Sequence, residues 1–354
     1  MKNLCFSQRF RKKVRSKKAG RLEKTGKAVI IKPDGTEQQT ATLNYMESEY
    51  SAMTKIAVLL PCWNEELTIQ KVISDFKNEL PDAEIYVYDN NSTDNSAALA
   101  EQAGAIVRHV PIQGKGHVVR QMFQEIDADC YLMVDTDDTY PAEYAKELLA
   151  PILAGKADMV TGDRLSTTYH TVNTRPFHSF GNSLVCTMIR LLFSYKIADA
   201  MTGYRAFSRR FVRNCPILCS GFELETEMTL FAMDKKLPLI EIPIPYRARP
   251  EGSHSKLNTC SDGLRVLRTI FHLFKAYRPL LFFGWSGLFV LLIAAGLFTP
   301  VLIEYIETGL VPKFPTLFCA ITLGVIGMVI MLSGVIMNSI KHYFDCLFEL
   351  HMKK

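Results

Sequence analysis

Two long stretches near the C-terminus contain no charged residue, and they restrict the fold more than any other feature of the sequence. They run from Leu280 to about Ile303 and from Thr316 to Ile340. Each is longer than the roughly 20 apolar residues that a helix needs to cross the hydrocarbon core of a bilayer. A buried hairpin of this length is improbable in a water-soluble domain. The sequence therefore predicts a two-helix transmembrane region over residues 280–342, in which neither helix has an ionisable residue that would mark an ion path.

The segment 259–279, just before the first span, is amphipathic and basic. Apolar side chains recur at helical spacing beside basic ones: Leu264, Leu267, Ile270, Phe271 and Phe274 alternate with Arg265, Arg268, His272, Lys275 and Arg278. The pattern is typical of a helix that lies on a membrane surface, although an ordinary surface helix would also produce it. Basic residues precede the first span, whereas the connecting loop is mainly acidic. By the positive-inside rule, both termini, including the tail 343–354, are cytoplasmic.

Residues 1–53 are basic and lack hydrophobic periodicity. Ten lysines and arginines between Arg9 and Lys27 account for the net charge of +5. No apolar core follows them, so the run is not a secretory signal peptide. It is expected to be a disordered tail, with attraction to anionic lipid as the alternative. Nucleic-acid binding is not expected, because no recognition module accompanies the charge. The nine cysteines form no C-x-x-C pair and are expected to be reduced thiols of a cytosolic domain.

Between these ends, residues 54–258 alternate short apolar runs with amphipathic segments. A helix that opens at Asn64 is expected to bury Leu67. The expected strands are 55–61, 85–89, 105–110, 131–134, 158–162 and 205–208, with an extended edge at 237–246, and further helices are expected at 97–103, 116–126, 141–153, 176–193 and 222–233. This alternation predicts an α/β domain with a mostly parallel sheet that is covered on both faces.

Acidic residues follow two of the expected strands. The buried run Tyr131–Val134 leads into Asp135 and Asp137, and Asp89 ends another strand. In an open α/β sheet, ligands bind at the carboxyl ends of the strands. Two carboxylates there are enough for Mg²⁺, which also takes phosphate oxygens and water. An acidic turn that caps the next helix is the alternative interpretation. No P-loop sequence is present, which favours a nucleotide held through a metal ion.

Several motifs, taken in order, resemble the family-2 inverting glycosyltransferases of GT-A fold, in particular the polyprenyl-phosphate branch that includes dolichol-phosphate mannose synthases. They cover about residues 55–260: Leu60-Pro61-Cys62-Trp63-Asn64-Glu65-Glu66, Tyr88-Asp89-Asn90-Asn91-Ser92-Thr93-Asp94, Gly114-Lys115-Gly116, Asp135-x-Asp137, Gly162-Asp163-Arg164, Asp199-Ala200-Met201-Thr202-Gly203-Tyr204-Arg205 and Ser255-Lys256-Leu257. The resemblance implies a GT-A, Rossmann-like domain, followed here by the amphipathic helix and two spans.

The resemblance also implies roles for individual residues. Contacts to the nucleotide sugar are expected from Pro61, Asn64, Glu65, Asp89, Asn91, Lys115, Asp135 and Asp137, and the last two of these would hold Mg²⁺ or Mn²⁺ on the diphosphate. The acceptor phosphate is expected to lie near Arg164, Arg175, Ser179, Arg205, Arg247, Arg249 and Lys256. Asp199 matches the aspartate that serves as base or acceptor-positioning group, and Arg164 is the second expected catalytic residue. Glu223, Glu225 and Glu227 are expected to form a charged helix face with a packing contact.

Two positions depart from the family pattern. Thr139 stands where a glutamine often supplies a further metal ligand, so Thr139, Asp138 and water remain alternatives for that place. Asn90 stands where a second acid often follows Asp89.

The expected reaction transfers a hexose from a UDP- or GDP-sugar to a polyprenyl phosphate, with inversion. A lipid phosphate has a second pKa of about 6 and is largely dianionic, so it needs cations rather than a general base. One alternative is a hydroxyl acceptor on a glycolipid or polysaccharide. Another, from a different class, is a catalytically silent membrane scaffold. Association of identical chains through the transmembrane helices is left open.

Overall fold

The computed structural model describes residues 54–167, 178–193, 195, 197–221, 223–250, 252, 271–272 and 274–352. The predicted tail 1–53 and most of the predicted interfacial helix 259–279 lie outside these residues. The predicted α/β domain and both long apolar segments lie largely within them.

The described domain is built on a seven-stranded sheet with the order β3-β2-β1-β4-β6-β5-β7. The strands are β1 (Ile56–Cys62), β2 (Glu84–Asp89), β3 (Ile106–His109), β4 (Cys130–Met133), β5 (Met159–Asp163), β6 (Arg205–Ser208) and β7 (Leu239–Pro243). All neighbouring pairs are parallel except β4–β6 and β5–β6, because β6 runs in the opposite direction. The mostly parallel sheet expected from the sequence is confirmed.

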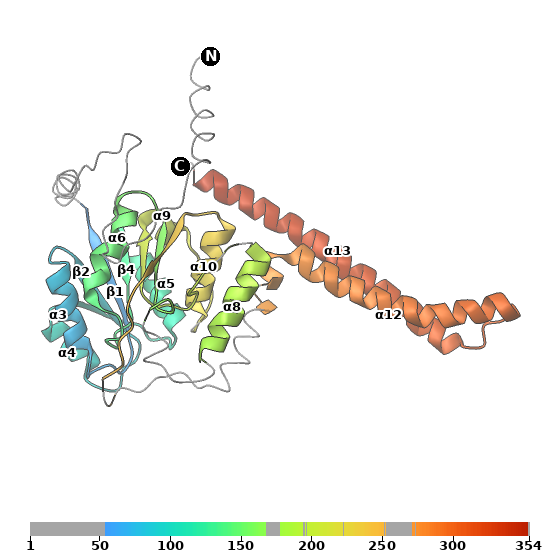
Figure 1. Ribbon diagram of the computed structural model, residues 1–354, viewed down its shortest axis with the longest axis horizontal. Helices are drawn as coiled ribbons and strands as arrows, with labels where there is room; N and C mark the ends of the chain where they lie inside the picture. Colours follow the sequence, from blue (N-terminus) through green and yellow to red (C-terminus); the bar gives the residue numbers. More distant parts are fainter. Residues whose placement is uncertain are drawn as a thin grey trace, which may run out of the picture. The chain divides into compact units, whose positions relative to one another are not determined.

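Helices cover both faces of the sheet (Figure 1). The helices are α3 (Ile69–Glu79), α4 (Ser96–Gln102), α5 (Lys115–Glu125), α6 (Ala145–Leu153), α8 (His178–Phe193), α9 (Arg209–Asn214) and α10 (Leu224–Asp234), with a short 3-10 turn η1 (Ala142–Tyr144). In the central strand β1, Val58 and Leu60 join a core with α3, α4 and α6. Ala57 and Leu59 face a second core with α5, α9 and α10. Burial on both faces explains why β1 is a continuous apolar run rather than an alternating one.

Two local expectations were wrong. The helix predicted from Asn64 begins only at Ile69, and Leu67 is 62% exposed instead of buried. The cause is local: Asn64 has a left-handed backbone with φ of 53°, which interrupts a helix. Helix α9, which was not anticipated, begins where the Ser208 hydroxyl accepts a hydrogen bond from Phe211 N.

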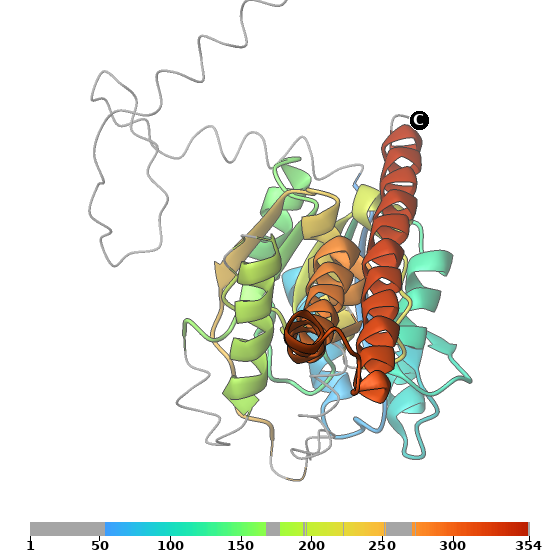
Figure 2. The same cartoon turned by 90° about the vertical axis from the view of Figure 1, so that its right-hand side faces the viewer.

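The two apolar stretches form long helices, α12 (Pro279–Thr308) and α13 (Phe314–His351), which lie side by side (Figures 1 and 2). Both are long and apolar enough to cross a bilayer. Glycines allow the two backbones to approach. A Cβ atom on Gly287 would overlap the Met331 side chain and lie 2.8 Å from the Gly327 carbonyl oxygen. Small residues at such contacts are typical of helices that pair within a membrane.

Helix α13 continues through most of the segment that was predicted to be a separate C-terminal tail. Its last turns contact α10 of the α/β domain: the Phe348 and Phe231 rings meet edge to face at 5.9 Å between centroids. Lys341 Nζ lies 2.7 Å from an Asp234 carboxylate oxygen, and Lys235 pairs with Asp345. These contacts explain why the helix does not end at residue 342.

Candidate active site

The acidic pair lies where the chain leaves β4, and hydrogen bonds fix the residue between the two acids. Thr136 Oγ1 donates to the Pro61 carbonyl at 3.2 Å, and Thr136 O accepts from Thr68 Oγ1 at 2.6 Å. Asp135 and Asp137 are close enough to influence each other electrostatically. Burial, followed by the Asp135 charge, raises the pKa of Asp137 despite the opposing charge of Arg249.

Asp137 is held from two sides. Its Oδ1 accepts hydrogen bonds from Thr139 Oγ1 at 2.6 Å and Thr139 N at 3.2 Å, and its Oδ2 pairs with the Arg249 guanidinium. Thr139 is fully buried and acts here as a donor to the acid. Asp138 instead pairs with Lys71 at 2.7 Å. In this arrangement Thr139 orients Asp137, whereas Asp138 forms an ion pair with Lys71 of α3.

Asp135 is paired with a lysine that contacts a second carboxylate. Lys115 Nζ lies 2.5 Å from Asp135 Oδ1 and 2.6 Å from Glu225 Oε1. Burial opposes the charge on both partners, but the mutual attraction outweighs it: the pKa of Asp135 is lowered and that of Lys115 is raised. Glu225 was expected on a charged helix face with a packing contact, yet its side chain is only 6% exposed and completes this cluster.

The glycines beside Lys115 let its loop pack against the chain that leads into α10. A Cβ atom on Gly114 or Gly116 would overlap the carbonyl oxygens of Ser220 and Cys219, respectively. Gly114 N also donates to Asn90 Oδ1 at 2.7 Å. Asn90 Nδ2 in turn donates to Val110 O at 3.1 Å and Ile112 O at 2.8 Å, which a carboxylate cannot do, and this gives a physical reason for the departure from the acid expected there.

Asp89 ends β2, and the register with β1 sets it opposite Cys62. Because β1 also pairs in parallel with β4, Asp89 lies at the same edge of the sheet as the acidic pair. Its Oδ2 lies 3.3 Å from both Ser92 N and His109 Nδ1. Its Oδ1 is buried and has no hydrogen-bond partner among the described residues. Because a buried acceptor left unpaired costs free energy, this oxygen is suited to a hydrogen-bond donor from a ligand.

The loops after β1 and β2 are joined by hydrogen bonds. Asn64 N donates to Ser92 Oγ at 2.9 Å, Asn64 Oδ1 accepts from Thr93 N at 2.7 Å, and Glu65 N donates to Ser96 Oγ at 2.7 Å. Asn91, with φ of 60°, donates through Nδ2 to the Pro111 carbonyl at 2.8 Å. Both asparagines thus shape the rim around Asp89.

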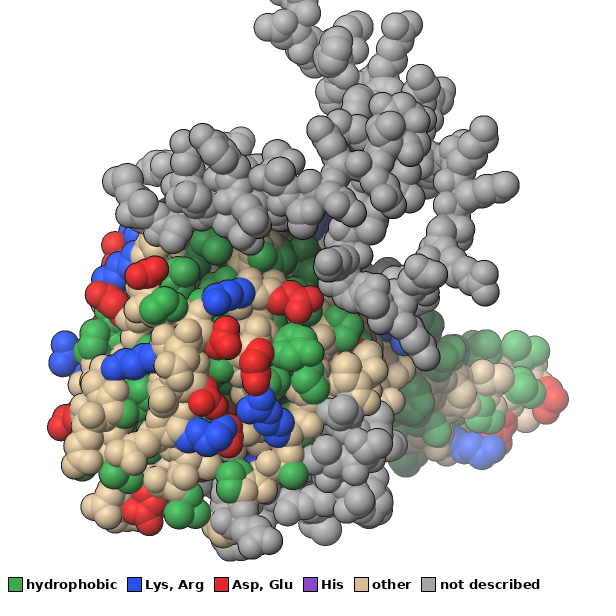
Figure 3. Space-filling view, turned by 60° about the vertical axis from the view of Figure 1, so that its left-hand side comes forward, with side chains coloured by type: hydrophobic (Ala, Val, Ile, Leu, Met, Phe, Trp, Pro, Cys, Tyr) green, Lys and Arg blue, Asp and Glu red, His purple; other side chains and the backbone are tan. Residues whose placement is uncertain are grey.

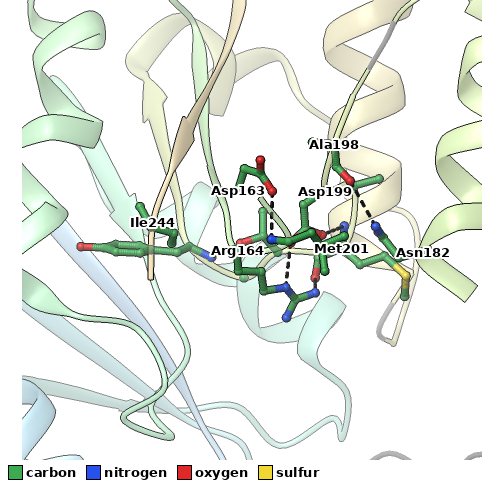
Figure 4. Close-up of polar contacts among 12 residues, drawn as sticks. Asp163, Arg164, Asn182, Ala198, Asp199, Met201 and Ile244 are labelled. Atoms are coloured by element: carbon green, nitrogen blue, oxygen red, sulfur yellow. Dashed lines mark hydrogen bonds and ion pairs between the residues drawn. The ribbon is translucent and has the colours of Figure 1, made fainter. Parts of the chain in front are cut away.

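Arg164 and Asp199 form a buried ion pair at the turn that leads to β6 (Figure 4). Arg164 Nε donates to Asp199 Oδ2 at 2.7 Å, and its Nη2 donates to Met201 O at 3.0 Å. Asp199 is 0% exposed and also accepts from Met201 N at 3.1 Å. The following turn contacts the acids directly, because a Cβ atom on Gly203 would overlap the Asp135 carboxylate. The two segments predicted to be catalytic therefore meet.

Arg205 is not in the place expected of an acceptor-binding residue. It is 0% exposed and donates to Thr202 O and Ala200 O, both at 2.8 Å, and to Thr229 Oγ1 at 2.8 Å. These bonds tie the 200–202 turn to α10, so the guanidinium is engaged inside the domain. We therefore leave Arg205 out of the candidate acceptor site.

Replacement of Arg205 by methionine is expected to destabilise the protein by about 3 kcal/mol, because it removes hydrogen bonds to carbonyl oxygens that stay buried. Thermal or denaturant unfolding measures the change. Arg213→Met is the control, since Arg213 is 61% exposed at its side chain and pairs with the exposed carboxylate of Asp127. A loss no larger than that of the control would mean that the buried bonds of Arg205 do not hold the turn.

The remaining predicted acceptor residues divide into two groups. Arg247 Nη2 donates to the Glu143 carboxylate at 2.8 Å, and Arg249 contacts Asp137 as described above. Arg175 and Lys256 lie outside the described residues, and Ser179 is located only as a position in α8. Over the face of the domain drawn in Figure 3, acidic and basic side chains stand next to one another rather than in separate fields.

The acidic pair fits a divalent metal ion. Carboxylates are hard oxygen ligands, and here two of them are neutralised by the cations of Lys115 and Arg249. The described part of the chain contains no group of three or more His, Cys, Asp or Glu side chains that could hold a metal. Phosphate oxygens and water would therefore complete the coordination, as Mg²⁺ and similar ions commonly allow.

Comparison with known proteins shows the class to which this α/β domain belongs. Residues 57–215 match the profile of "Glycosyl transferase family 2". Glycosyltransferase AglJ of Haloferax volcanii is 34% identical over 66% of this chain and 76% of its own length. A dolichyl-phosphate hexose transferase of the same organism is 27% identical over 61% of this chain and 92% of its own length.

Solved structures share the fold. Glucosyl-3-phosphoglycerate synthase from Mycobacterium tuberculosis, in complex with Mn²⁺, UDP and phosphoglyceric acid, superposes with a TM-score of 0.55 at 20% identity, covering 68% of this chain and 84% of that one. The chain belongs to glycosyltransferase family 2 and is an enzyme with the GT-A fold. The family and the fold expected from the sequence are confirmed.

Proposed function

We propose that this enzyme transfers a hexose from a nucleotide sugar to a polyprenyl phosphate and inverts the anomeric configuration. The observation that carries the proposal is the meeting of an acidic pair with Arg164 in a chain that also has two helices long enough to span a bilayer. The name of the related dolichyl-phosphate hexose transferase supports a lipid-phosphate acceptor.

The donor side of the site would use the edge formed by β1, β2 and β4. The unpaired Asp89 Oδ1 suits a donor group of the nucleoside, and the loops that carry Asn64, Glu65 and Asn91 frame it. Asp135 and Asp137 would hold Mg²⁺ or Mn²⁺ against the diphosphate. When bound, such an ion would stabilise the negative charge that develops on the leaving diphosphate.

The acceptor side would use the arginines. Arg164 is fixed by Asp199 and Met201 O, so it is oriented before any ligand binds. Arginine binds phosphate through paired N–H groups, which suits a dianionic lipid phosphate. Arg249 is the second candidate, and Arg175, Ser179, Arg247 and Lys256 remain proposed contacts.

The arrangement around Asp199 favours a phosphate acceptor over a hydroxyl. Its carboxylate is completely buried and accepts hydrogen bonds from Arg164 and Met201 N. We therefore infer that Asp199 positions Arg164 and does not remove a proton. In the proposed step, a phosphate oxygen forms the new bond to the anomeric carbon as the bond to the diphosphate oxygen breaks on the opposite face. No proton has to be removed from a dianionic phosphate.

The helices support a membrane location with the catalytic domain on the cytoplasmic side. Helix α12 starts after Lys275 and Arg278, while the turn between the helices contains Lys313 in an ion pair with Glu304. The bias of basic residues toward the start of α12 favours a cytoplasmic start. The C-terminal end of α13 contacts α10 of the catalytic domain. These contacts are consistent with the start of α12 and the end of α13 lying on the same side of the membrane as that domain.

A screen of radiolabelled nucleotide sugars tests the proposal. Membranes that contain the protein, supplied with Mn²⁺ and polyprenyl phosphate, are expected to move label from one UDP- or GDP-sugar into the organic phase. Omission of the polyprenyl phosphate is the control. Label that instead enters a soluble sugar or a preformed glycolipid would favour the hydroxyl acceptor. No turnover of any nucleotide sugar would favour a silent scaffold.

A further inference from the structure

Lys115 lies between two carboxylates that come from distant parts of the chain. Asp135 is one of the proposed metal ligands, whereas Glu225 lies in the first turn of α10, 110 residues beyond Lys115. All three side chains are largely withdrawn from solvent, with 14% of Lys115, 29% of Asp135 and 6% of Glu225 exposed. The proposed reaction gives Glu225 no task, although a buried carboxylate is costly unless it is paired.

The neighbouring glutamate shows what a purely structural acid does in this helix. Glu227 accepts hydrogen bonds from Leu218 N at 3.2 Å and Cys219 N at 3.1 Å, so it holds the loop before α10. The Glu225 carboxylate instead accepts a hydrogen bond from the Lys115 ammonium at 2.6 Å. Glu225 also lies near the positive end of the α10 dipole, which favours a charged carboxylate there.

A cation that binds Asp135 through Oδ1 has to replace Lys115 at that oxygen. An ammonium released into a half-buried site without a partner would make this exchange unfavourable. Glu225 Oε1 is already 2.6 Å from the same Nζ, so the lysine keeps one carboxylate partner when it loses the other. It also stays next to the place where the diphosphate would lie.

We propose that Glu225 is a positioning residue that holds Lys115 beside the acidic pair, so that a metal ion can take Asp135 without leaving a buried ammonium unpaired. The inference rests on the proposed metal site at Asp135 and Asp137. It assigns to Glu225 a role in metal and diphosphate binding and none in bond formation. Lys115 is the group through which it acts.

Glu225→Asp tests the inference, because it keeps the charge but shortens the side chain by about 1.5 Å. The shorter carboxylate cannot reach Nζ from the same backbone, so Lys115 depends on Asp135 alone and competes more strongly with the metal. We expect the affinity of the nucleotide-free enzyme for Mn²⁺, measured by electron paramagnetic resonance of free Mn²⁺, to fall about tenfold. In a Lys115→Met background the same change is expected to alter the affinity less than about twofold, because the competing cation is absent.

Glu227→Asp is the matched control and is expected to leave Mn²⁺ affinity unchanged. An equal effect of Glu225→Asp in both backgrounds, or no effect in either, would overturn the inference. Should Glu225→Asp fail to fold, Lys115→Met tests the competition on which the inference depends: a raised Mn²⁺ affinity supports the inference, and a lowered or unchanged affinity overturns it. Wild-type Mn²⁺ affinity in Asp137→Asn would instead reject the proposed metal site itself.

Discussion

Asp137→Asn is expected to lower the rate of sugar transfer at least about 100-fold while the domain remains folded. An asparagine oxygen is a neutral and weaker ligand, so the stabilisation of charge on the leaving diphosphate is largely lost. The fold should tolerate the change because asparagine Oδ1 can still accept from Thr139 Oγ1 and N. Burial and the charge of Asp135 already raise the pKa of Asp137, which means that the charged form of this carboxylate destabilises the metal-free folded state. Loss of the charge should therefore not unfold the domain. Initial rates at saturating Mn²⁺, with thermal unfolding of the same samples, measure both effects.

Asp138→Asn is the matched control for this substitution. Asp138 is the next residue in the loop, and its carboxylate pairs with Lys71 on α3. The cations that pair with Asp135 and Asp137 are instead Lys115 and Arg249. We expect its transfer rate to stay within about threefold of the wild-type rate, as is usual when an exposed ion pair is lost. Equal losses in the two variants would show that the loop, and not the Asp137 carboxylate, is what the reaction requires.

Arg164→Lys is expected to lower kcat/KM for the polyprenyl phosphate about 100-fold and to leave the affinity for the nucleotide sugar within about threefold. A lysine ammonium cannot keep the contacts to Asp199 and Met201 O and also present paired N–H groups to a phosphate. The charge is retained, so the loss reports on geometry. Steady-state kinetics with the lipid varied at saturating donor, and donor binding by calorimetry, separate the two effects.

Arg210→Lys is the control for the loss of an arginine–aspartate pair. Arg210 Nε donates to Asp158 Oδ1 at 2.9 Å, and Asp158 precedes β5 whereas Arg164 follows it. The two pairs therefore lie at opposite ends of one strand. Little change is expected in kcat/KM of Arg210→Lys. A defect of Arg164→Lys that is confined to donor affinity would remove Arg164 from the acceptor site.

The acidic pair could be predicted from the sequence because its cause is local. A fully buried parallel strand is a continuous apolar run, and the acids that follow Val134 must then lie at the carboxyl edge of the sheet. The same reasoning gave Asp89 at the end of β2. The long helices were equally predictable, since the length of an uncharged apolar stretch can be read directly from the sequence and compared with the thickness of a bilayer.

The roles of Arg205 and Glu225 could not be predicted in this way. Arg205 lies in a motif that resembles an acceptor site, but its burial depends on carbonyl oxygens of the preceding turn and on Thr229 in α10. Glu225 looks like one of three alternating glutamates on a helix, and only the packing of α10 against the loop at Lys115 separates it from Glu227. Tertiary contacts decide both cases, across 24 residues between Arg205 and Thr229 and across 110 residues between Lys115 and Glu225.

The continuation of α13 illustrates a different limit. The charged residues after Ile340 mark the end of the membrane-spanning composition, and the sequence therefore predicts a separate tail over residues 343–354. A helix need not end where its apolar stretch ends: Lys341 and Asp345 lie one turn apart and pair with Asp234 and Lys235, respectively, at the end of α10. Phe348 then packs on Phe231. The sequence contains these residues but does not show that they share a surface.

The chemical state of the phosphate in the product tests the proposed reaction most directly. Purified enzyme, Mn²⁺, the active nucleotide sugar and polyprenyl phosphate are incubated, and the lipid is examined by phosphorus-31 NMR and by treatment with alkaline phosphatase. We expect the phosphomonoester signal to be replaced by a phosphodiester signal, in a sugar-bearing lipid that resists the phosphatase. A sugar-bearing lipid that keeps its phosphomonoester, or a sugar found only on a hydroxyl acceptor, would contradict transfer to the lipid phosphate.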